Sequence, residues 1–451
     1  MSRSYDFDQW LLLVTHKGVE EIYIRFEEKA FRLPGCIFSC LTLKRLHLYG
    51  VVEPMNFPCI LPNVASFCFE CVDFGPINCL DCAIDVPVLE KLSFIHCRNI
   101  FHFDITAPKL CSLTIEFCSS TVRGKFLPVN LDLRSISTLD LGGHLQGFKE
   151  FSRMGFHLNV EYLKLSCDQE FYTKSDGSSS MFVHLLRLCP KLRKLDIKLP
   201  WRLHLYGVIV DPINLPCIFP NVASLCFEWV DFGPINCLDC AIDVLALEDL
   251  SFISCKNTFY FNITTPKLRS LTIKSGSSNE LGKFLPVNLD LRSISTLDLG
   301  GCVQGFVKEF TKMGFRLNVK YLKLSCYEEF YTQSDRSFSV LAHLLRLCPK
   351  LCKLVINLFW LRSVATECVD ALLELHDVAQ TNTMLHALKF ISFTGSHSET
   401  LFIKKLLASF STLERVVIVR EKYYCKKDST EIMQELWYLH VASTKMKIII
   451  V

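Results

Sequence analysis

The stretch Asn159–Cys167 reads NVEYLKLSC and decides the fold of this chain. An apolar residue is followed by two variable residues and then by a leucine, a variable residue and a second leucine. Side chains alternate in direction along a strand, so both leucines point into a core while the residues between them face away. The pattern predicts one short strand with an apolar face and a polar face.

The same pattern recurs along the first half of the chain. It reads TLKRLHLYG from Thr42, NVASFCFEC from Asn63, VLEKLSFIHC from Val88, KLCSLTIEFC from Lys109, SISTLDLGG from Ser135 and KLRKLDIKL from Lys191. The leading apolar residues lie 21, 25, 21, 26, 24 and 32 positions apart, which is mostly the spacing of leucine-rich repeats. Stacked in parallel, these strands would form a curved sheet with pairs such as Leu46 and Leu48, or Leu113 and Ile115, turned inward. The sequence therefore predicts an α/β leucine-rich-repeat solenoid.

The segments between the strands predict an irregular convex side. SMFVHLLRLCPKL from Ser180 and SVLAHLLRLCPKL from Ser339 carry leucines at helical spacing, and a proline ends each pattern. NFPCILPNV from Asn56 is interrupted by proline and is too short for more than a turn.

A large part of the chain is duplicated. Val72–Val86 reads VDFGPINCLDCAIDV, as does Val230–Val244, and the twenty letters of Gly124–Gly143 return at Gly282–Gly301, an offset of 158. We expect three parts: a first repeat array over 1–201, its duplicate over 202–360 and a C-terminal α/β unit over 361–451. Leu195 and Leu203 lie only 8 positions apart at the junction, so we expect a break near Pro200 that separates two arcs.

Composition narrows the class of protein. Half of the 451 residues are hydrophobic, which is ample for a long core, and the net charge of +3 gives no strong field for nucleic acid or an anionic membrane. MSRSYDFDQW lacks the layout of a secretion signal, and no run of about 18 apolar residues is present. We expect a soluble protein of the cytoplasm or nucleus, with neither nucleic acid nor membrane as partner.

The 23 cysteines have two readings, disulfides in a secreted scaffold or reduced thiols in a repeat protein. Several follow a predicted strand directly, where leucine-rich repeats use Asn or Cys to turn the chain; these are Cys97, Cys118, Cys167, Cys255 and Cys326. We therefore expect reduced, buried cysteines.

Four cysteines have a spacing that suits zinc. They are Cys68, Cys71, Cys79 and Cys82. The second copy has Trp229 in place of Cys71, and residues three apart on a strand face opposite sides. We therefore favour a structural role and expect no metal or other cofactor.

Motifs that carry catalysis are missing from the sequence. There is no GxxxxGK[ST] loop, no GxSxG elbow and no HExxH helix. Asp140 and Asp298 lie beside Thr138 and Thr296 on predicted strands, where a solvated face explains them at least as well as acid–base chemistry does. We expect a protein that is not an enzyme.

The polar strand positions should form the concave face, where solenoids generally bind their partners. Alternating charges and the lack of repeated basic and stacking aromatic residues favour a protein partner over nucleic acid, and a merely solvated face is the alternative. Between the copies, Lys91 becomes Asp249 and Asp196 becomes Val355. The candidate protein-binding residues are Arg45, His47, Lys91, Thr138, Asp140, Tyr162, Lys164, Arg202, His204, Asp249, Thr296, Asp298, Tyr321 and Lys323.

Both ends of the chain resemble one family. FDQWLLLVTHKGVEEIYIRF from Phe7 and FRLPGCIFSCLTLKRLHLYG from Phe31 are similar to the first repeat region of plant F-box/FBD/LRR-repeat proteins. Leu385–Val419 resembles the FBD motif, with Gly395, Glu399 and a helix through Leu406. With the repeats, the resemblance covers essentially the whole chain.

The resemblance implies a function. In that family an N-terminal F-box binds the Skp adaptor of a cullin ubiquitin ligase, and the repeats are thought to choose the substrate. Only six residues precede Phe7, so we expect no F-box here and doubt that the Skp adaptor binds. The resemblance implies a non-catalytic module for substrate recognition, with a C-terminal FBD-like unit that covers the last repeat. The alternative is a truncated or regulatory repeat fragment that binds protein partners without a ligase role.

Overall fold

The fold is known from a computed structural model of the chain. The residues that it describes are 2–26, 31–32, 35–50, 52–53, 59–74, 83–100, 104–117, 131–143, 157–166, 185–198, 221–230, 241–255, 258, 262–274, 289–301, 306–307, 310–311, 316–325, 334–363, 378–379, 382–421, 431 and 446–451.

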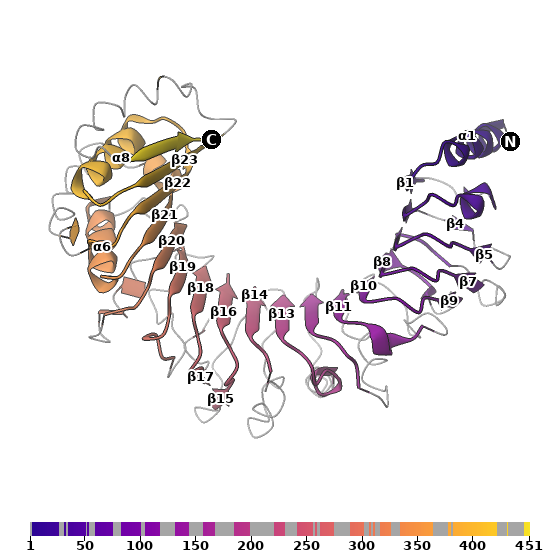
Figure 1. Cartoon of the computed structure of the whole chain (residues 1–451), viewed down its shortest axis with the longest axis horizontal. Helices are drawn as coiled ribbons and strands as arrows, with labels where there is room; N and C mark the ends of the chain where they lie inside the picture. Colours follow the sequence, from indigo (N-terminus) through magenta and orange to yellow (C-terminus); the bar gives the residue numbers. More distant parts are fainter. Residues whose placement is uncertain are drawn as a thin grey trace. The chain divides into compact units, whose positions relative to one another are not determined.

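The chain forms two compact units, Met1–Val222 (unit 1) and Ala223–Val451 (unit 2). The described strand pairings in the sheet of unit 1 are all parallel, and Figure 1 shows its strands side by side in the order of the sequence. The strands are β1 (Glu21–Arg25), β3 (Arg45–Tyr49), β6 (Ser66–Glu70), β8 (Lys91–Cys97), β10 (Ser112–Phe117), β11 (Thr138–Gly142), β12 (Tyr162–Ser166) and β13 (Lys194–Lys198). Every strand predicted in the first copy is confirmed.

Unit 2 repeats this design and extends it. Its parallel strands are β14 (Ser224–Glu228), β16 (Asp249–Ile253), β18 (Ser270–Lys274), β19 (Thr296–Gly300), β20 (Tyr321–Ser325), β21 (Lys353–Asn357), β22 (Ala387–Phe393), β23 (Arg415–Arg420) and β24 (Lys447–Ile450). The strands of the FBD-like segment, β22 to β24, continue the sheet in the same parallel sense. Parallel strands separated by a repeat length confirm the predicted leucine-rich-repeat solenoid.

Behind the sheets, the described parts of the connecting segments are irregular, as predicted. The described part of the chain includes the helices α1 (Ser2–His16), α6 (Ser334–Leu347) and α8 (His397–Ser409), with short 3-10 turns at η1 (Gly35–Ser39), η3 (Leu133–Ser135) and η7 (Leu358–Ser363). Short parallel strands form further small sheets: β2 (Phe31–Arg32) with β4 (Val52–Glu53), β5 (Cys59–Ile60) with β7 (Ala83–Asp85) and β9 (Asp104–Thr106), and β15 (Ala241–Asp243) with β17 (Asn262–Thr264). The expectation of only a turn in the segment from Asn56 was therefore wrong, because Cys59–Ile60 pairs with β7.

The core of each unit lies on the apolar face of its strands. Leu46 and Leu48 are 1% and 0% exposed, and Leu113 and Ile115 are both 0% exposed, which confirms the predicted inward pairs. Aromatic rings stack behind neighbouring strands: Phe69 and Phe94 have centroids 5.5 Å apart, and their counterparts Phe227 and Phe252 have centroids 5.6 Å apart. Each such side chain contributes about 1.5–3 kcal/mol by burial, so the repeated leucines and phenylalanines dominate the stability of the sheets.

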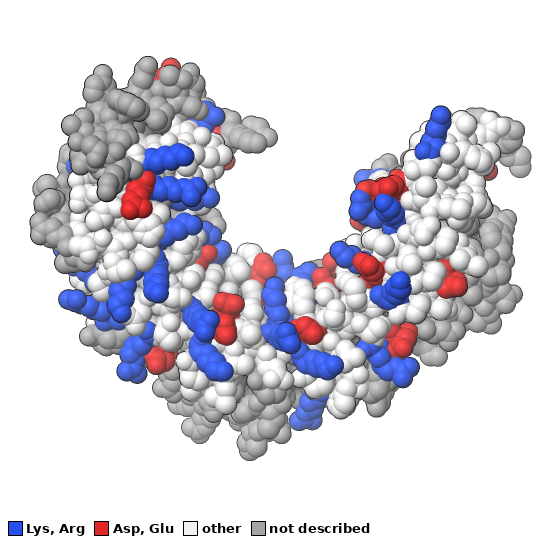
Figure 2. All heavy atoms as spheres, viewed as in Figure 1, with Lys and Arg blue, Asp and Glu red and all other residues white. Residues whose placement is uncertain are grey.

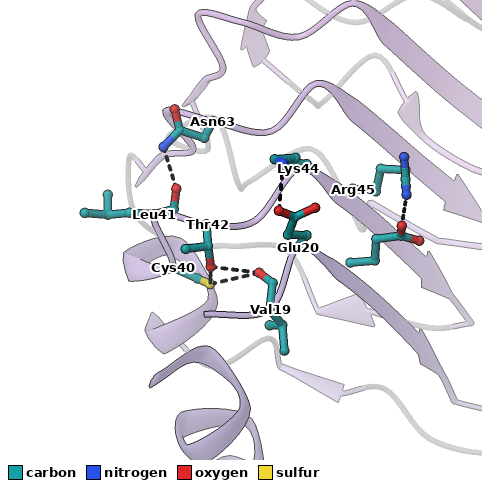
Figure 3. Close-up of polar contacts among 9 residues, drawn as sticks. Val19, Glu20, Cys40, Leu41, Thr42, Lys44, Arg45 and Asn63 are labelled. Atoms are coloured by element: carbon teal, nitrogen blue, oxygen red, sulfur yellow. Dashed lines mark hydrogen bonds and ion pairs between the residues drawn. The ribbon is translucent and has the colours of Figure 1, made fainter. Parts of the chain in front are cut away.

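Polar side chains join successive turns just before the strands. Thr42 Oγ1 donates to the Val19 carbonyl at 2.8 Å, and the Asn63 side chain donates to the Leu41 carbonyl (Figure 3). Asn159 Nδ2 and Asn318 Nδ2, which are equivalent in the two copies, donate over 2.7 Å to the carbonyls of Arg134 and Arg292. These bonds satisfy backbone acceptors that the strand ladder leaves over, and so they hold the repeats at one spacing.

The FBD-like segment is built around a buried carboxylate. Gly395 adopts a φ of +80°, a left-handed conformation that favours glycine, and Ser396 caps α8. The Ser396 side chain accepts from the Glu399 amide while Glu399 accepts from the Ser396 amide, which is a complete capping box. Glu399 is 0% exposed. The motif residues Gly395 and Glu399 therefore shape the start of the helix.

Two predictions about organisation stay predictions. The expected break near Pro200 lies outside the described residues, because residues 199–220 are not among them. The division into parts over 1–201, 202–360 and 361–451 also remains a proposal.

Candidate protein-binding face

The first, third and fifth positions of each sheet strand form what we call the open face. The register of the parallel pairs aligns these positions from strand to strand, so Thr114, Asp140, Lys164 and Asp196 follow one another across β10 to β13. In unit 2 the same row runs through Thr272, Asp298, Lys323 and Val355 across β18 to β21. The alternation that buries the leucines thus places a row of polar side chains on the opposite side of the sheet.

The first strands of unit 1 hold their polar side chains in local pairs. The guanidinium of Arg45 forms an ion pair with Glu21, and Figure 3 shows this pair beside that of Lys44 with Glu20. His47 Nε2 lies 3.0 Å from Glu70 Oε2, and the Tyr23 ring meets the His47 ring edge-on with centroids 4.6 Å apart.

A compact polar cluster spans β11 to β13. Lys164 Nζ donates to Asp140 Oδ2 at 2.8 Å, and this hydrogen bond to a carboxylate raises the pKa of Lys164 above its ordinary value. Tyr162 Oη donates to Asp196 Oδ2 at 2.7 Å. Lys194 Nζ lies 3.3 Å from the same oxygen and 4.5 Å from the centroid of the Tyr162 ring. The charges of this cluster balance within it.

The equivalent cluster of unit 2 spans β18 to β21 and is paired differently. Lys323 Nζ lies 3.1 Å and Lys274 Nζ 3.4 Å from Asp298 Oδ2, so two ammonium groups share one carboxylate. Lys353 Nζ lies 5.1 Å from the centroid of the Tyr321 ring. Asp140 and Asp298 occupy equivalent positions in the two copies. Among the described residues, Asp140 pairs with one lysine and Asp298 with two, so the surroundings of Asp298 are more positive.

The structure describes most of the residues predicted to bind a partner. Thr138, Asp140, Tyr162 and Lys164 lie together on β11 and β12, and Thr296, Asp298, Tyr321 and Lys323 lie together on β19 and β20. Lys91 and Asp249 are exposed at the first positions of β8 and β16. Arg202 and His204 lie outside the described residues.

Sequence reasoning missed Glu116 and Lys274, which flank these clusters at the fifth positions of β10 and β18. The prediction covered only the first and third positions of each strand, whereas the alternation that continues through TIEFC and TIKSG places the fifth position on the same face.

The proposed zinc spacing is only partly described. Cys68 lies on the open face of β6 and Cys71 follows with a φ of +56°, while Cys79 and Cys82 lie outside the described residues. Burial raises the pKa of Cys68 to about 11, which disfavours the thiolate that binds metal. No group of three or more His, Cys, Asp or Glu side chains suited to a metal ion is found in the described part of the chain.

Cysteine thiols at or just after the ends of strands donate hydrogen bonds to backbone carbonyls. Cys97 Sγ donates to the Phe69 carbonyl at 3.3 Å, and Cys255 Sγ donates to the Phe227 carbonyl at the same distance. The cysteines among the described residues are free thiols. Of the five cysteines predicted to be buried, Cys97 is buried, whereas Cys255 is only half-buried, so the prediction was wrong for Cys255. The other three, Cys118, Cys167 and Cys326, lie outside the described residues.

Native Cys97 and Cys255 should react very slowly with iodoacetamide at pH 8. Burial raises the pKa of both thiols to about 12, so roughly a thousandfold less thiolate is present than for a free cysteine near 8.5. Timed labelling followed by peptide mass spectrometry measures this, with the same protein in denaturant as control. Labelling of either thiol at the denatured rate would contradict the packing described for it.

No helix in the described ranges is long and apolar enough to cross a membrane.

Parallel strands of repeat length, leucines on one face and a polar row on the other define the class of this protein as a leucine-rich-repeat solenoid. No protein-family model matches the chain. The chain is similar to an F-box/FBD/LRR-repeat protein of Arabidopsis thaliana, 44% identical over 112 residues, which are 25% of this chain and 27% of the relative. It is also similar to a putative FBD-associated F-box protein of the same plant, 26% identical over 193 residues, 41% of this chain and 44% of the relative.

The predicted resemblance to F-box/FBD/LRR-repeat proteins is therefore confirmed, while its extension over essentially the whole chain stays a prediction, because the two matches cover 25% and 41% of this chain. The matched region spans less than half of the length of either relative.

Proposed function

We propose that the chain is a non-catalytic protein-binding module that recognises substrates for an F-box ubiquitin ligase. The names of both relatives contain F-box and FBD, which supports a ligase context. The observation that carries the proposal is the pair of open faces, on which parallel strands in register hold rows of charged and aromatic side chains.

The partner that we propose is a protein rather than nucleic acid or a membrane. Acidic and basic side chains alternate on β11 to β13, where Asp140, Lys164 and Asp196 lie in one row. A nucleic-acid groove would need cations along the whole row, with aromatic rings free for stacking, and β11 to β13 of unit 1 do not offer this. Tyr162 is instead held by Asp196.

A photo-crosslinking amino acid placed at Thr138 or Thr296 should capture the same protein in cells, and one placed at exposed Lys109 in the turn before β10 should not. Charge reversal by Lys164→Glu and Lys323→Glu should reduce capture about tenfold, because charged anchors of an interface each contribute one to a few kcal/mol. Lys320→Glu, an exposed change just before β20, is the control. If neither charge reversal lowers the amount of captured protein, binding through the open face is refuted.

The ligase role needs a separate readout. The chain joined to an F-box segment should direct ubiquitylation of the captured protein in a reaction reconstituted with the Skp adaptor and a cullin. Capture without ubiquitylation would favour the alternative, a repeat module that binds its partner without a ligase role.

A further inference from the structure

The duplication has placed different charges on one backbone arrangement. In both copies the third strand positions pair in the same register, as Thr114, Asp140 and Lys164 do in unit 1 and Thr272, Asp298 and Lys323 in unit 2. The Asp and Lys at the centre are the same, so the chemical difference between the two faces comes from the residues around them.

Two residue replacements between the copies make the charge around the central Asp and Lys more positive in unit 2. Glu116 of unit 1 is replaced by Lys274 in unit 2, and Asp196 is replaced by Val355. Lys274 reaches Asp298 across Gly300, where a Cβ atom would lie only 2.9 Å from Lys274 Cγ. The carboxylate of Asp298, whose side chain is 14% exposed, is thereby shared between Lys274 and Lys323.

The second exchange removes an acceptor. Val355 is 2% exposed and offers no charge, whereas Asp196 binds both Tyr162 and Lys194 in unit 1. Lys353, the counterpart of Lys194, keeps only its ring contact with Tyr321 among the described residues.

The next strand adds another cation, because Lys389 on β22 lies in register beside Val355. No described carboxylate lies within ion-pair distance of Lys353 or Lys389.

Further along, Arg415 and Lys447 occupy the first positions of β23 and β24. Figure 2 shows Lys and Arg side chains gathered over the strands from β20 to β23 on the side turned to the viewer. The cations on the open face of β18 to β24 are Lys274, Lys323, Lys353, Lys389, Arg415 and Lys447. Among the described residues at these strand positions, the carboxylate is that of Asp298.

We propose that the open face of β18 to β24 binds an acidic segment of a partner protein, and that the equivalent face of β10 to β13 does not. This inference rests on the proposed protein-binding function and names the chemistry of the bound segment. Carboxylates of the partner replace the acceptors that Asp196 supplies in unit 1, and the aliphatic stems of the lysines lie against the segment.

A fluorescein-labelled short peptide of alternating Glu and Ser tests the proposal by anisotropy with the full chain. It should bind with a stoichiometry of one and weaken steeply between low and physiological salt, because the attraction is between partly exposed charges. A Lys/Ser peptide of the same length is the control. Equal binding of both peptides would overturn the proposal.

Exchanging the two copies' residues locates the site. Lys274→Glu with Val355→Asp should weaken peptide binding about tenfold or more, and the reciprocal Glu116→Lys with Asp196→Val should create a second site. Because Val355 is buried, the exposed or half-buried pair Lys353→Glu and Lys389→Glu provides a second variant with less risk to folding, checked by thermal unfolding. Unchanged affinity in both double variants of unit 2 would overturn the proposal.

Two other outcomes are decisive. In the first, a single-stranded RNA of equal charge binds more tightly than the peptide, and the same variants abolish its binding. This result would mean that the face binds nucleic acid and not an acidic protein segment. In the second, crosslinking at Thr138 and Thr296 persists but the acidic peptide does not bind. This result would refute the proposal of an acidic segment and would leave the proposed protein-binding function intact.

Discussion

Glu399→Ala should lower the free energy of unfolding of the FBD-like part of unit 2 by about 2–4 kcal/mol. The carboxylate is fully buried, and its Oε2 accepts from the Thr394 amide at 2.8 Å, the Thr394 hydroxyl at 2.9 Å and the Ser396 amide at 3.2 Å. Alanine leaves all three donors without their acceptor and also opens the capping box of α8. The loss therefore combines unsatisfied buried donors with a weakened helix start.

Amide hydrogen exchange is the suitable measurement, since a solenoid can open locally. Protection should fall throughout α8 and in β22, while β14 and β16 keep theirs. Exposed Glu414, just before β23, is the matched control, and Glu414→Ala should change stability by about 0.5 kcal/mol or less. Equal losses for the two glutamates would mean that the buried carboxylate does not organise this turn.

Leu163→Ala and Leu322→Ala should each cost about 2–5 kcal/mol. Both leucines are 0% exposed and occupy the same position in β12 and β20, so each substitution opens a cavity behind one repeat. In a stack of repeats each unit packs on its neighbours, so the loss of protection should spread to adjacent strands of the same unit and leave the other unit intact. Hydrogen exchange resolved by peptide provides the measurement.

The adjacent open-face lysines supply the controls for the leucines. Lys164→Ala and Lys323→Ala each remove one partly exposed ion pair, which is worth about 1 kcal/mol or less. The double Leu163→Ala/Leu322→Ala variant should show additive losses, because the two leucines lie in different compact units. Loss of protection in both units after the single Leu163→Ala change would contradict two separately packed sheets.

The strands were predictable because their signal is local. A leucine on each side of one variable residue fixes which side chains enter the core, and Leu46, Leu48, Leu113 and Ile115 lie where that rule puts them. The short strands behind the sheet, such as Ala83–Asp85 and Asn262–Thr264, were missed because two or three residues carry no readable period.

The candidate face was predicted in part for the same reason. The sequence gives the outward direction of Lys164 or Asp298, yet it does not say which charge meets which. Glu116 and Lys274 stand at equivalent positions, and only the alignment of β10 with β11 and of β18 with β19 shows that they flank the central Asp.

By itself, the sequence determined the repeat, its duplication, the position of each main strand and the face that each residue shares. The tertiary structure alone decided that Asp298 serves two lysines, that Tyr162 depends on Asp196, and that Glu399 is buried at the start of α8. The physical reason is distance along the chain: side-chain alternation acts between neighbouring residues. Hydrogen bonds and ion pairs form between strands some 24 to 34 residues apart, and only their register brings the partners together.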